Sequence, residues 1–389
     1  MKKGMSTRCV HAGEGPEPTT GAIGTPIFQN TTFLYPNPEP WAIKGKRVGD
    51  YYIYTRYNNP TIEALEAKVA DLEGAEGAVA FSSGMAAIST TLLTMAGEGG
   101  HIVSARDLYG GTYTLMRDIL PGLGIEVTFV DTGDTDGFWK ALREDTRLVY
   151  CESITNPVLK VADIPVLADI AHGKDVPLVV DATFATPINQ NPLELGADVV
   201  VHSGTKYLGG HGDVTGGVVA TNDEMAHDIR DKMVFYGGCI DPGAAWLMMR
   251  GLKTLELRVA RQNATARWLA DWLEGHDKVV SSIHPELESH PDHEVVPRVL
   301  RAGGGMVTFD LGELEACHRC LEGFEAITVA ASLGGVESLV SLPVETSHWE
   351  LDAEERAALG ISDGHVRLSV GIEDLSDLMS DLERGLERV

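Results

Sequence analysis

Apolar residues in the first two thirds of the chain follow two spacings, one typical of helices and one typical of buried strands. Between residues 62 and 72 they recur every three or four positions, which predicts an amphipathic helix. Short apolar runs, typical of buried strands, lie at 77–81, 101–104, 126–130, 148–151, 178–180 and 199–201. Further helical patterns lie between these runs, at 85–95, 113–120 and 165–171. This alternation predicts an α/β domain around a mostly parallel sheet, with helices on both faces.

The two ends of the chain have a different pattern. The first fifty residues are rich in glycine, proline and threonine, which predicts an extended arm of the kind that reaches a neighbouring subunit. After Pro242 we expect one long helix over 244–274, then a mixture of strands and helices. A chain of 389 residues is too long for one ordinary core. We therefore expect an arm (1–58), a large domain (59–243) and a smaller α+β domain (244–389).

Composition narrows the class of protein. Hydrophobic residues make up 43% of the chain and charged residues 23%, as in soluble globular proteins. No apolar run approaches the roughly 20 residues that span a bilayer. The lysines near the N-terminus are not followed by an apolar segment, so we expect a cytoplasmic protein without a secretory signal. A net charge of −26 without a lysine or arginine cluster argues against a nucleic-acid partner.

Cysteines and histidines give no prediction of a metal site. The five cysteines are scattered and do not form a disulfide framework. Cys317 and Cys320 have the spacing of a redox motif, but they lie in a stretch with a helical pattern. His290, His293 and Glu294 resemble a metal cluster, although such residues on a loop more often face solvent.

Lys206 is the most informative single residue. It follows the apolar run 199–201 and precedes a glycine-rich loop, which suits an amine at the mouth of a parallel sheet. There it could form a Schiff base with an aldehyde cofactor, because burial favours the neutral, nucleophilic amine. A surface lysine in a strand-to-loop turn is the plainer alternative.

Asp181 ends the apolar run 178–180 at the predicted carboxyl edge of the sheet, where open α/β folds bind ligands. If the cofactor is pyridoxal 5′-phosphate, a buried aspartate there can keep the pyridine nitrogen protonated. Lys206 follows 25 positions later, after one helix and one strand. Ser203 and Thr205 flank the lysine and could bind the phosphate.

Two further segments offer groups that bind phosphate. Residues 82–87 place small side chains at the start of a helix, where backbone N–H groups can approach an anion. An ordinary N-capped helix is the alternative. Tyr54 and Arg56 share one face of an extended segment and offer a hydroxyl and a guanidinium. Their alternative is an interface or surface loop.

Tyr109 and Arg367 complete the set of candidate residues. Tyr109 precedes Gly110 and Gly111, where its ring could stack on a flat cofactor or simply join the core. Arg367 lies inside the apolar strand 366–370, where a charge is costly unless it is paired. Its partner is expected to be a substrate carboxylate or, alternatively, an internal aspartate or glutamate.

Together these motifs resemble the cysteine/methionine-metabolism family of pyridoxal-phosphate enzymes, the cystathionine γ-synthase-like group. The resemblance runs in the correct order from residues 7–13 to residues 367–374. It implies the fold of fold-type I, aspartate-aminotransferase-like enzymes, and it makes the large domain the cofactor-binding one. It also implies a homo-oligomer, at least a dimer of subunits that share active sites and in full a tetramer, with a small amino acid as substrate.

The resemblance assigns a role to each candidate residue. Lys206 becomes the Schiff-base lysine and catalytic base, and Asp181 the partner of the pyridine nitrogen. Tyr109 would stack on the ring and assist proton transfer, and Asn156 would approach the phenolic oxygen of the cofactor. Phosphate would be held by Gly84, Met85, Ser203 and Thr205, and by Tyr54 and Arg56 of a neighbouring subunit, with Tyr54 also catalytic. Substrate carboxylate would be held by Ser332 and Arg367.

The chain departs from the pattern of the family at the residue after Asp181. Family members usually have an asparagine there, whereas this chain has Ala182. The missing side-chain amide affects local hydrogen bonding, but the carboxylate on which the chemistry depends is present.

The resemblance leaves several reactions open. Cystathionine-handling members tend to have an acidic residue at the position of Ile53 and an arginine at that of Thr114. An apolar and a small residue at these positions cannot bind a zwitterionic distal end. This favours a smaller or less charged distal group, as in methionine, homocysteine or an O-acylated homoserine. Methionine γ-lyases typically have a cysteine at the position of Gly111, whereas residues 52–56 resemble O-acetylhomoserine sulfhydrylases. We expect γ-elimination on a sulfur amino acid, with γ-replacement (sulfhydrylase or cystathionine γ-synthase type) as the alternative. A catalytically silent scaffold is a remote third interpretation.

Overall fold

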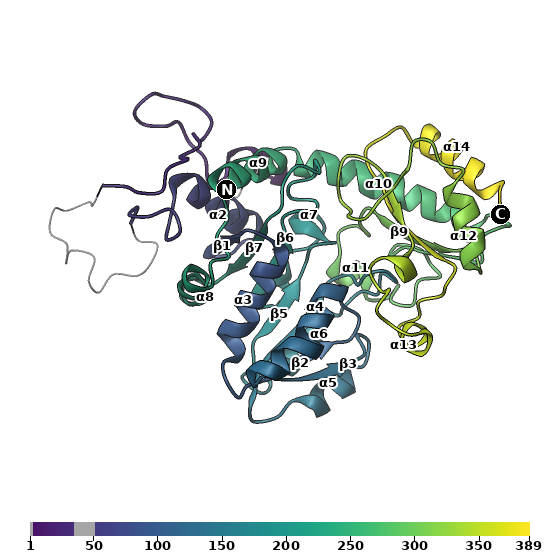
Figure 1. Cartoon of the computed structure of the whole chain (residues 1–389), viewed down its shortest axis with the longest axis horizontal. Helices are drawn as coiled ribbons and strands as arrows, with labels where there is room; N and C mark the ends of the chain where they lie inside the picture. Colours follow the sequence, from purple (N-terminus) through teal and green to yellow (C-terminus); the bar gives the residue numbers. More distant parts are fainter. Residues whose placement is uncertain (1–2, 35–50) are drawn as a thin grey trace.

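The computed structural model describes residues 3–34 and 51–389. Figure 1 shows two sheet-containing parts side by side, with the long helix α10 (Leu255–Glu274) running from one into the other. The N-terminal segment extends from the outer end of the larger part (Figure 1).

The larger part is built on a seven-stranded sheet in the order β1-β7-β6-β5-β4-β2-β3. Its strands are β1 (Gly77–Phe81), β2 (His101–Ala105), β3 (Glu126–Val130), β4 (Thr146–Glu152), β5 (Leu178–Asp181), β6 (Val199–Ser203) and β7 (Gly217–Thr221). β7 runs antiparallel to its neighbours β1 and β6, and the other neighbouring strands are parallel. The prediction of a mostly parallel sheet is confirmed.

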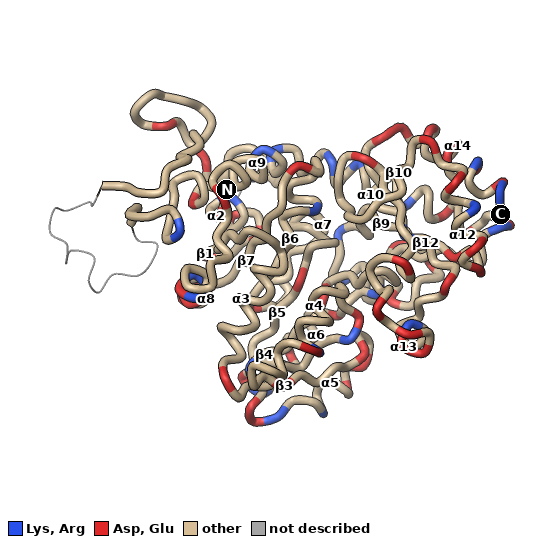
Figure 2. Tube along the Cα trace, viewed as in Figure 1, with Lys and Arg blue, Asp and Glu red and all other residues tan. Residues whose placement is uncertain are grey.

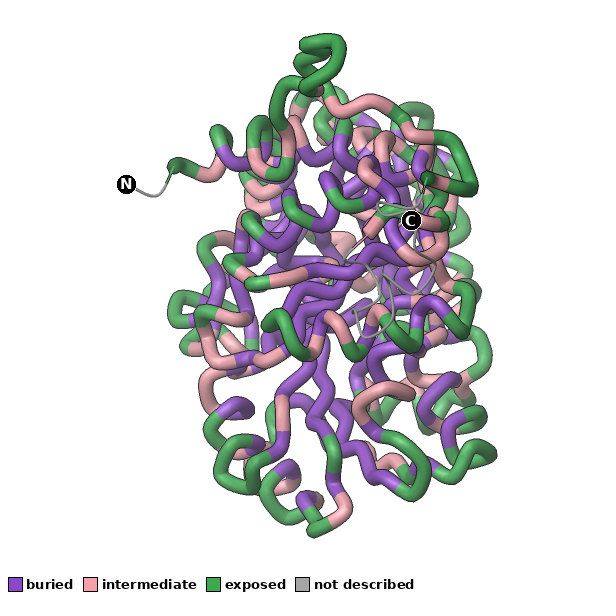
Figure 3. Tube along the Cα trace, turned by 90° about the vertical axis from the view of Figure 1, so that its left-hand side faces the viewer, coloured by how far each residue is buried: buried purple, intermediate pink, exposed green. Residues whose placement is uncertain are grey.

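Helices cover both faces of this sheet because its strands are apolar on both sides. In β1, Val79 and Phe81 join one core, whereas Ala78 and Ala80 join the other. The first core includes residues of α3 (Gly84–Ala96), α6 (Ile164–His172) and α8 (Asp223–Tyr236). The second includes residues of α2 (Pro60–Glu73), α9 (Pro242–Leu252) and α10. In Figure 3 the strands form a buried centre inside an exposed shell.

Short helical segments connect the strands of the larger part. The predicted helix over 113–120 belongs to a longer stretch that begins as an α-helix, continues as a π-helical turn and ends as a 3₁₀ turn. These segments are α4 (Gly110–Thr114), η2 (Leu115–Ile119), η3 (Leu120–Leu123), α5 (Thr135–Ala141), α7 (Thr186–Asn189) and η4 (Pro192–Leu195).

The smaller part contains a five-stranded, mainly antiparallel sheet in the order β10-β11-β12-β9-β8. Its strands are β8 (Ser281–Ile283), β9 (Met306–Asp310), β10 (Thr328–Val329), β11 (Leu339–Ser341) and β12 (His365–Ser369). Its short helices are α11 (Val296–Val299), α12 (Leu314–Leu321), η5 (Pro343–Glu345), α13 (Ala353–Ala358) and α14 (Leu375–Leu386). This is the expected smaller α+β domain; the boundaries at 58 and 243 stay predictions.

The single long helix expected over 244–274 is wrong, because α9 ends at Leu252 and α10 begins at Leu255. Side chains bind the backbone at the break. The Thr254 hydroxyl and the Arg258 guanidinium both donate to the carbonyl of Gly251. Such side-chain bonds compete with the helical ladder and end α9 there.

The first fifty residues were expected to form an extended arm, and this expectation is wrong for part of that segment. Residues 5–11 form α1 (Met5–His11), in which Arg8 and Cys9 are buried. Arg8 Nε lies 2.8 Å from a carboxylate oxygen of Asp71 on α2, so the helix is tied to the larger part. The remainder of the predicted arm includes residues 35–50, which lie outside the described residues.

Charged side chains are spread over both parts, with acidic residues prominent near α8, α13 and α14 (Figure 2). None of the described helices is long and apolar enough to cross a membrane. Cys317 and Cys320 lie on α12, as the helical pattern of this stretch predicted, and both are buried. Across residues 3–34 and 51–389, histidine, cysteine and acidic side chains form no group suited to a metal ion.

Candidate active site

The carboxyl ends of three parallel strands bring the main candidate residues together. Glu152 ends β4, Asp181 ends β5, and Lys206 follows the end of β6 by three residues. β5 lies between β4 and β6. The carboxyl edge of a parallel sheet is where open α/β folds bind ligands, so this edge is the candidate site.

Lys206 is partly buried and points towards the smaller part of the molecule. Its Nζ donates a hydrogen bond of 2.9 Å to the hydroxyl of Ser332. Desolvation, and secondarily the charge of Arg367, lower the pKa of this amine below its usual value. The lysine is therefore the desolvated amine that the sequence predicted, and the surface alternative is wrong.

Arg367 lies on β12 and is 6% exposed. Its Nη1 donates to Asn156 Oδ1 at 3.0 Å and its Nη2 to the carbonyl of Ser332 at 3.2 Å. Its buried Nε has no hydrogen-bond partner among the described residues, and desolvation lowers the pKa of Arg367 to about 10. These recorded partners are neutral, so the internal-acid alternative is not supported and the cation is suited to an anionic ligand.

Ser332 connects the two cations. Its hydroxyl accepts from Lys206, and its carbonyl accepts from Arg367. Its φ of 89° lies in the left-handed region, which is uncommon for a residue other than glycine. Backbone strain of this kind is often kept at functional sites, where the surrounding structure holds it.

Asp181 is buried, and Thr183 binds one of its carboxylate oxygens twice. Oδ1 accepts from the backbone N of Thr183 at 2.9 Å and from its hydroxyl at 2.5 Å. The same hydroxyl accepts from the backbone N of Ser203 at 2.8 Å. Burial raises the pKa of Asp181, with the bonds from Thr183 opposing that shift. A cation beside Oδ2 would stabilise the charged carboxylate.

Glu152 is a site residue that the sequence analysis did not single out. Its Oε1 accepts a hydrogen bond of 2.6 Å from the backbone N of Tyr109. Burial raises its pKa well above the usual range, and neighbouring Asp181 raises it further. A sequence signal was present, since Glu152 ends the apolar run 148–151 just as Asp181 ends the run 178–180.

The start of α3 lies directly against the end of β6. The Ser83 side chain caps the helix by accepting from the backbone N of Ala86. A Cβ at Gly84 would lie 2.8 Å from Cβ of Ser203, so only glycine permits this approach. Gly84, Met85 and Ser203 are thus grouped at a helix N-terminus, which favours an anion. The Thr205 hydroxyl is bound to the backbone of Gly216.

Tyr109 is an exposed residue with an anchored backbone. The residue is 48% exposed, and its backbone N donates to Glu152. A Cβ at Gly111 would lie 2.7 Å from the Tyr109 ring and 3.3 Å from Sδ of Met85. The glycine therefore allows the ring to lie close to the start of α3, and the core alternative for Tyr109 is wrong.

Tyr54 and Arg56 lie elsewhere in the chain. Arg56 Nη1 donates to the carbonyl of Val234 on α8 at 2.6 Å, and its guanidinium packs over the rings of Tyr54 and Tyr57. Tyr54 is 38% exposed. These described contacts are not with Lys206 or Asp181, and a role in the site of a neighbouring subunit stays a prediction.

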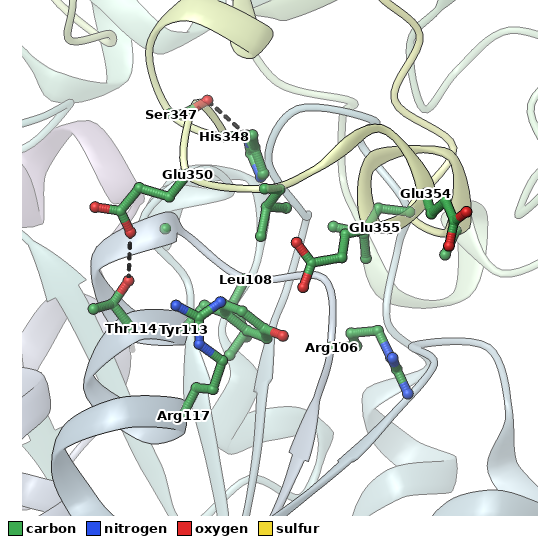
Figure 4. A pocket seen from close by; sticks show the side chains of 14 residues that line it. Arg106, Leu108, Tyr113, Thr114, Arg117, Ser347, His348, Glu350, Glu354 and Glu355 are labelled. Atoms are coloured by element: carbon green, nitrogen blue, oxygen red, sulfur yellow. Dashed lines mark hydrogen bonds between the residues drawn. The ribbon is translucent and has the colours of Figure 1, made fainter.

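A cavity of about 270 Å³ lies beside Tyr109, between α4 and η2 on one side and residues 347–359 on the other. Figure 4 shows Arg106, Arg117 and Glu355 around it, with Thr114 directed at Glu350. The Thr114 hydroxyl donates to Oε2 of Glu350 at 3.2 Å. The cavity wall therefore carries charges of both signs. The carboxylate of Glu350 beside Thr114 was not anticipated from the sequence, where only Ile53 and Thr114 were considered.

The donor set fits a flat, phosphate-bearing aldehyde. A desolvated amine, a buried carboxyl and a helix N-terminus lined by small residues surround the same sheet edge. The amine suits an aldehyde, the carboxyl a cationic ring nitrogen and the helix start a phosphate.

Comparisons with known proteins agree with this chemistry. Residues 6–387 match the family described as Cys/Met metabolism PLP-dependent enzyme. The chain is 44% identical to cystathionine γ-lyase of Bacillus subtilis over all of both chains. It is 43% identical to L-methionine γ-lyase of Fusobacterium nucleatum subsp. polymorphum, covering 100% of this chain and 99% of that one.

A solved structure extends the likeness to three dimensions. Cystathionine γ-lyase of Lactobacillus plantarum, complexed with L-serine, has a TM-score of 0.93 and 35% identity, covering 100% of this chain and 99% of that one. The family match covers nearly the whole chain and includes both sheets. The chain therefore belongs to the cysteine/methionine-metabolism family of pyridoxal-phosphate-dependent enzymes.

Proposed function

We propose that this enzyme catalyses γ-elimination on a sulfur-containing amino acid, with pyridoxal 5′-phosphate carried on Lys206. The observation that carries the proposal is the contact of Lys206 with Ser332 beside Arg367. It places a desolvated amine next to a buried cation with neutral hydrogen-bond partners. An amino-acid substrate has one carboxylate for the cation and one Cα proton for the amine.

Each residue of the site has a separate task. Arg367 and Ser332 orient the substrate carboxylate, and Asp181 would hold the ring nitrogen of the cofactor. Gly84, Met85, Ser203 and Thr205 would hold the phosphate, and Asn156 would approach the phenolic oxygen. When bound, the cofactor supplies an electron sink for negative charge at Cα.

Lys206 performs the proton transfers. Its lowered pKa gives it a neutral population that can remove the Cα proton, and then the Cβ proton that must leave before the Cγ substituent departs. Tyr109 would assist proton transfer to the leaving group. The products of elimination from a sulfur amino acid are a thiol (hydrogen sulfide from homocysteine), ammonia and a 2-oxo acid.

The substrate is methionine, homocysteine or cystathionine. The sequence at Ile53 and Thr114 favours a small distal group, whereas Glu350 places a carboxylate beside Thr114 that could accept a distal ammonium. The relatives carry both kinds of name, cystathionine γ-lyase and methionine γ-lyase. We infer a cytoplasmic homo-oligomer in which Tyr54 and Arg56 complete the site of a neighbouring subunit.

The first experiment tests the cofactor and its lysine. Purified protein is scanned for an absorbance band near roughly 420 nm and then reduced with borohydride, and the labelled peptide is identified. We expect the label on Lys206, and neither band nor label in Lys206→Ala. Absence of a band from the wild type after addition of the cofactor would favour a silent scaffold.

The second experiment separates elimination from replacement. The enzyme is incubated with methionine, with cystathionine, and with O-acetylhomoserine in the presence and absence of sulfide. We expect 2-oxobutyrate from a sulfur amino acid without sulfide. Homocysteine formed only when O-acetylhomoserine and sulfide are both present would instead identify a sulfhydrylase.

A further inference from the structure

Two buried carboxyl groups lie side by side at the candidate site. Glu152 and Asp181 are paired positions of the parallel strands β4 and β5. Paired positions of neighbouring strands point to the same face and lie about 5 Å apart. Glu152 is 4% exposed and Asp181 is 7% exposed, so both carboxyl groups are removed from water.

Glu152 joins the sheet to the residue expected to flank the cofactor ring. Its Oε1 accepts the backbone N–H of Tyr109 at 2.6 Å, and Tyr109 is the N-cap of α4. Because Tyr109 is half-exposed and is therefore only partly held by packing, its position depends strongly on how its backbone is held. The carboxyl of Glu152 provides that hold from β4.

The charges around Glu152 favour a neutral carboxyl. Burial raises its pKa well above the usual range, and Asp181 on β5 and Asp107 in the loop after β2 raise it further. Hydrogen bonds from the backbone of Tyr109 and Asn156 oppose this shift of the pKa without cancelling it. Lys160 lies 2.7 Å from Asp107 and balances that charge. On β4 itself, burial raises the pKa values of Tyr150 and Cys151, so both stay uncharged.

Asp181 is the carboxyl better suited to carry the negative charge. Both hydrogen bonds from Thr183 and the nearby His202 act to lower its pKa against burial. Buried carboxyl groups on paired positions of adjacent strands oppose each other's ionisation, so we expect one of them to keep a proton. A cationic ring nitrogen facing Asp181 would place the proton on Glu152.

We propose that Glu152 is a positioning residue of the cofactor site, whose neutral carboxyl holds the backbone of Tyr109 and leaves Asp181 as the charged partner of the ring nitrogen. This inference rests on the proposed function. It assigns to Glu152 a role in both geometry and charge, without contact with substrate.

The test compares the holoenzymes of wild type, Glu152→Gln and Glu152→Ala. Glutamine is neutral, and its carbonyl oxygen can still accept from Tyr109, whereas alanine removes the acceptor. Cofactor affinity and the pH dependence of the absorbance near roughly 420 nm are measured together with kcat and KM. Glu66→Gln is the matched control, because Glu66 is a buried carboxyl that, like Glu152, accepts a backbone N–H, that of Ala80 at 2.9 Å.

We expect the Glu152→Gln enzyme to keep the pH profile of the absorbance band and to bind the cofactor within about threefold of wild type. Glu152→Ala should weaken cofactor binding by about tenfold or more and lower kcat more than it raises KM, since a lost buried hydrogen bond is worth roughly 1–3 kcal/mol. Glu66→Gln should leave the absorbance profile unchanged.

A shifted profile in Glu152→Gln, or equal damage in the glutamine and alanine variants, would show that Glu152 is ionised and would overturn the inference. Failure of the proposed function has a different signature, namely a wild-type protein without the absorbance band. If the alanine variant does not fold, the profile of the glutamine variant still decides the question.

Discussion

At the residue scale, Arg367 and Lys206 place two cationic side chains in one desolvated site, joined through Ser332. Removal of water lowers the pKa of both groups. Two cations in a desolvated site destabilise the cofactor-free protein, and anionic ligands offset this destabilisation when they bind.

Replacing Arg367 with lysine should impair recognition of the substrate carboxylate. Arginine offers a planar fork to a carboxylate, whereas lysine offers a point charge that is more strongly hydrated. We expect KM to rise about 10- to 100-fold, the equivalent of roughly 1.4–2.8 kcal/mol, with a smaller change in kcat. Steady-state kinetics checks this.

Arg298→Lys is the control, because Arg298 is exposed and forms its ion pair with Asp163 at 2.6 Å on the surface. Its KM should equal that of the wild type. An unchanged KM in Arg367→Lys would mean that the substrate carboxylate binds elsewhere.

Replacing Lys206 with methionine should stabilise the cofactor-free protein at neutral pH. The pKa of Lys206 is lowered on folding, so the unfolded chain holds this proton more tightly and the wild-type protein gains stability as pH rises through the lowered pKa. We expect methionine to add about 1–2 kcal/mol near pH 7, with the gain shrinking towards pH ~10.

Urea unfolding of cofactor-free protein at several pH values measures this gain. Lys140→Met serves as the control, because Lys140 is exposed. A gain that is constant with pH would argue that packing, and not the charge on the amine, is responsible.

At the element scale, the approach of α3 to β6 builds the predicted phosphate site. Gly84 has no side chain between the helix and Ser203, so the helix N-terminus can lie against the strand end. The added Cβ of Gly84→Ala would also lie 3.1 Å from Cα of Ser203. Because that atom belongs to the backbone, the helix itself must move.

We therefore expect Gly84→Ala to weaken cofactor binding by tenfold or more and to destabilise the protein by about 1–3 kcal/mol. Cofactor titration and equilibrium unfolding give the two values. Gly122→Ala is the control, since a Cβ at Gly122 meets nothing within 4 Å. Normal cofactor affinity in Gly84→Ala would place the phosphate away from α3.

At the scale of the whole molecule, the site combines residues from both sheets, and we infer that a neighbouring subunit adds Tyr54 and Arg56. The Arg56 side chain donates to the carbonyl of Val234 at the end of α8, whereas Lys206 of the same chain donates to Ser332. A shared site makes activity a property of the assembly, which can be tested by mixing inactive subunits.

Mixed dimers of one Arg56→Ala chain and one Lys206→Ala chain should recover about half of wild-type activity, because one of their two sites is intact, and the unfractionated product of random co-expression should recover about a quarter. Each variant alone should be nearly inactive. Activity of purified mixed dimers, isolated with two different tags, is the measurement. A mixture of Lys206→Ala and Lys206→Met chains is the control and should stay inactive. If mixed dimers of Arg56→Ala and Lys206→Ala recover no activity, Arg56 acts in the site of its own subunit.

Local pattern was sufficient for much of the fold. The apolar runs at 77–81 and 126–130 are β1 and β3. β1 is buried at four of its five positions, as continuous apolar sequence predicts, whereas β3 lies at the edge of the sheet and only its Val130 is buried. The break between α9 and α10 was missed, since Thr254 and Arg258 end the helix through bonds to one carbonyl. That competition depends on how the side chains pack, which periodicity does not record.

The sequence by itself determined the class of chemistry, because an amine after one strand and a carboxylate at the end of another must meet at the edge of a parallel sheet. Only the tertiary structure decided that Arg367 has neutral partners and that Glu152 binds Tyr109. These contacts join residues 35 or more positions apart, and a pattern that records only neighbouring positions cannot show which distant side chains meet.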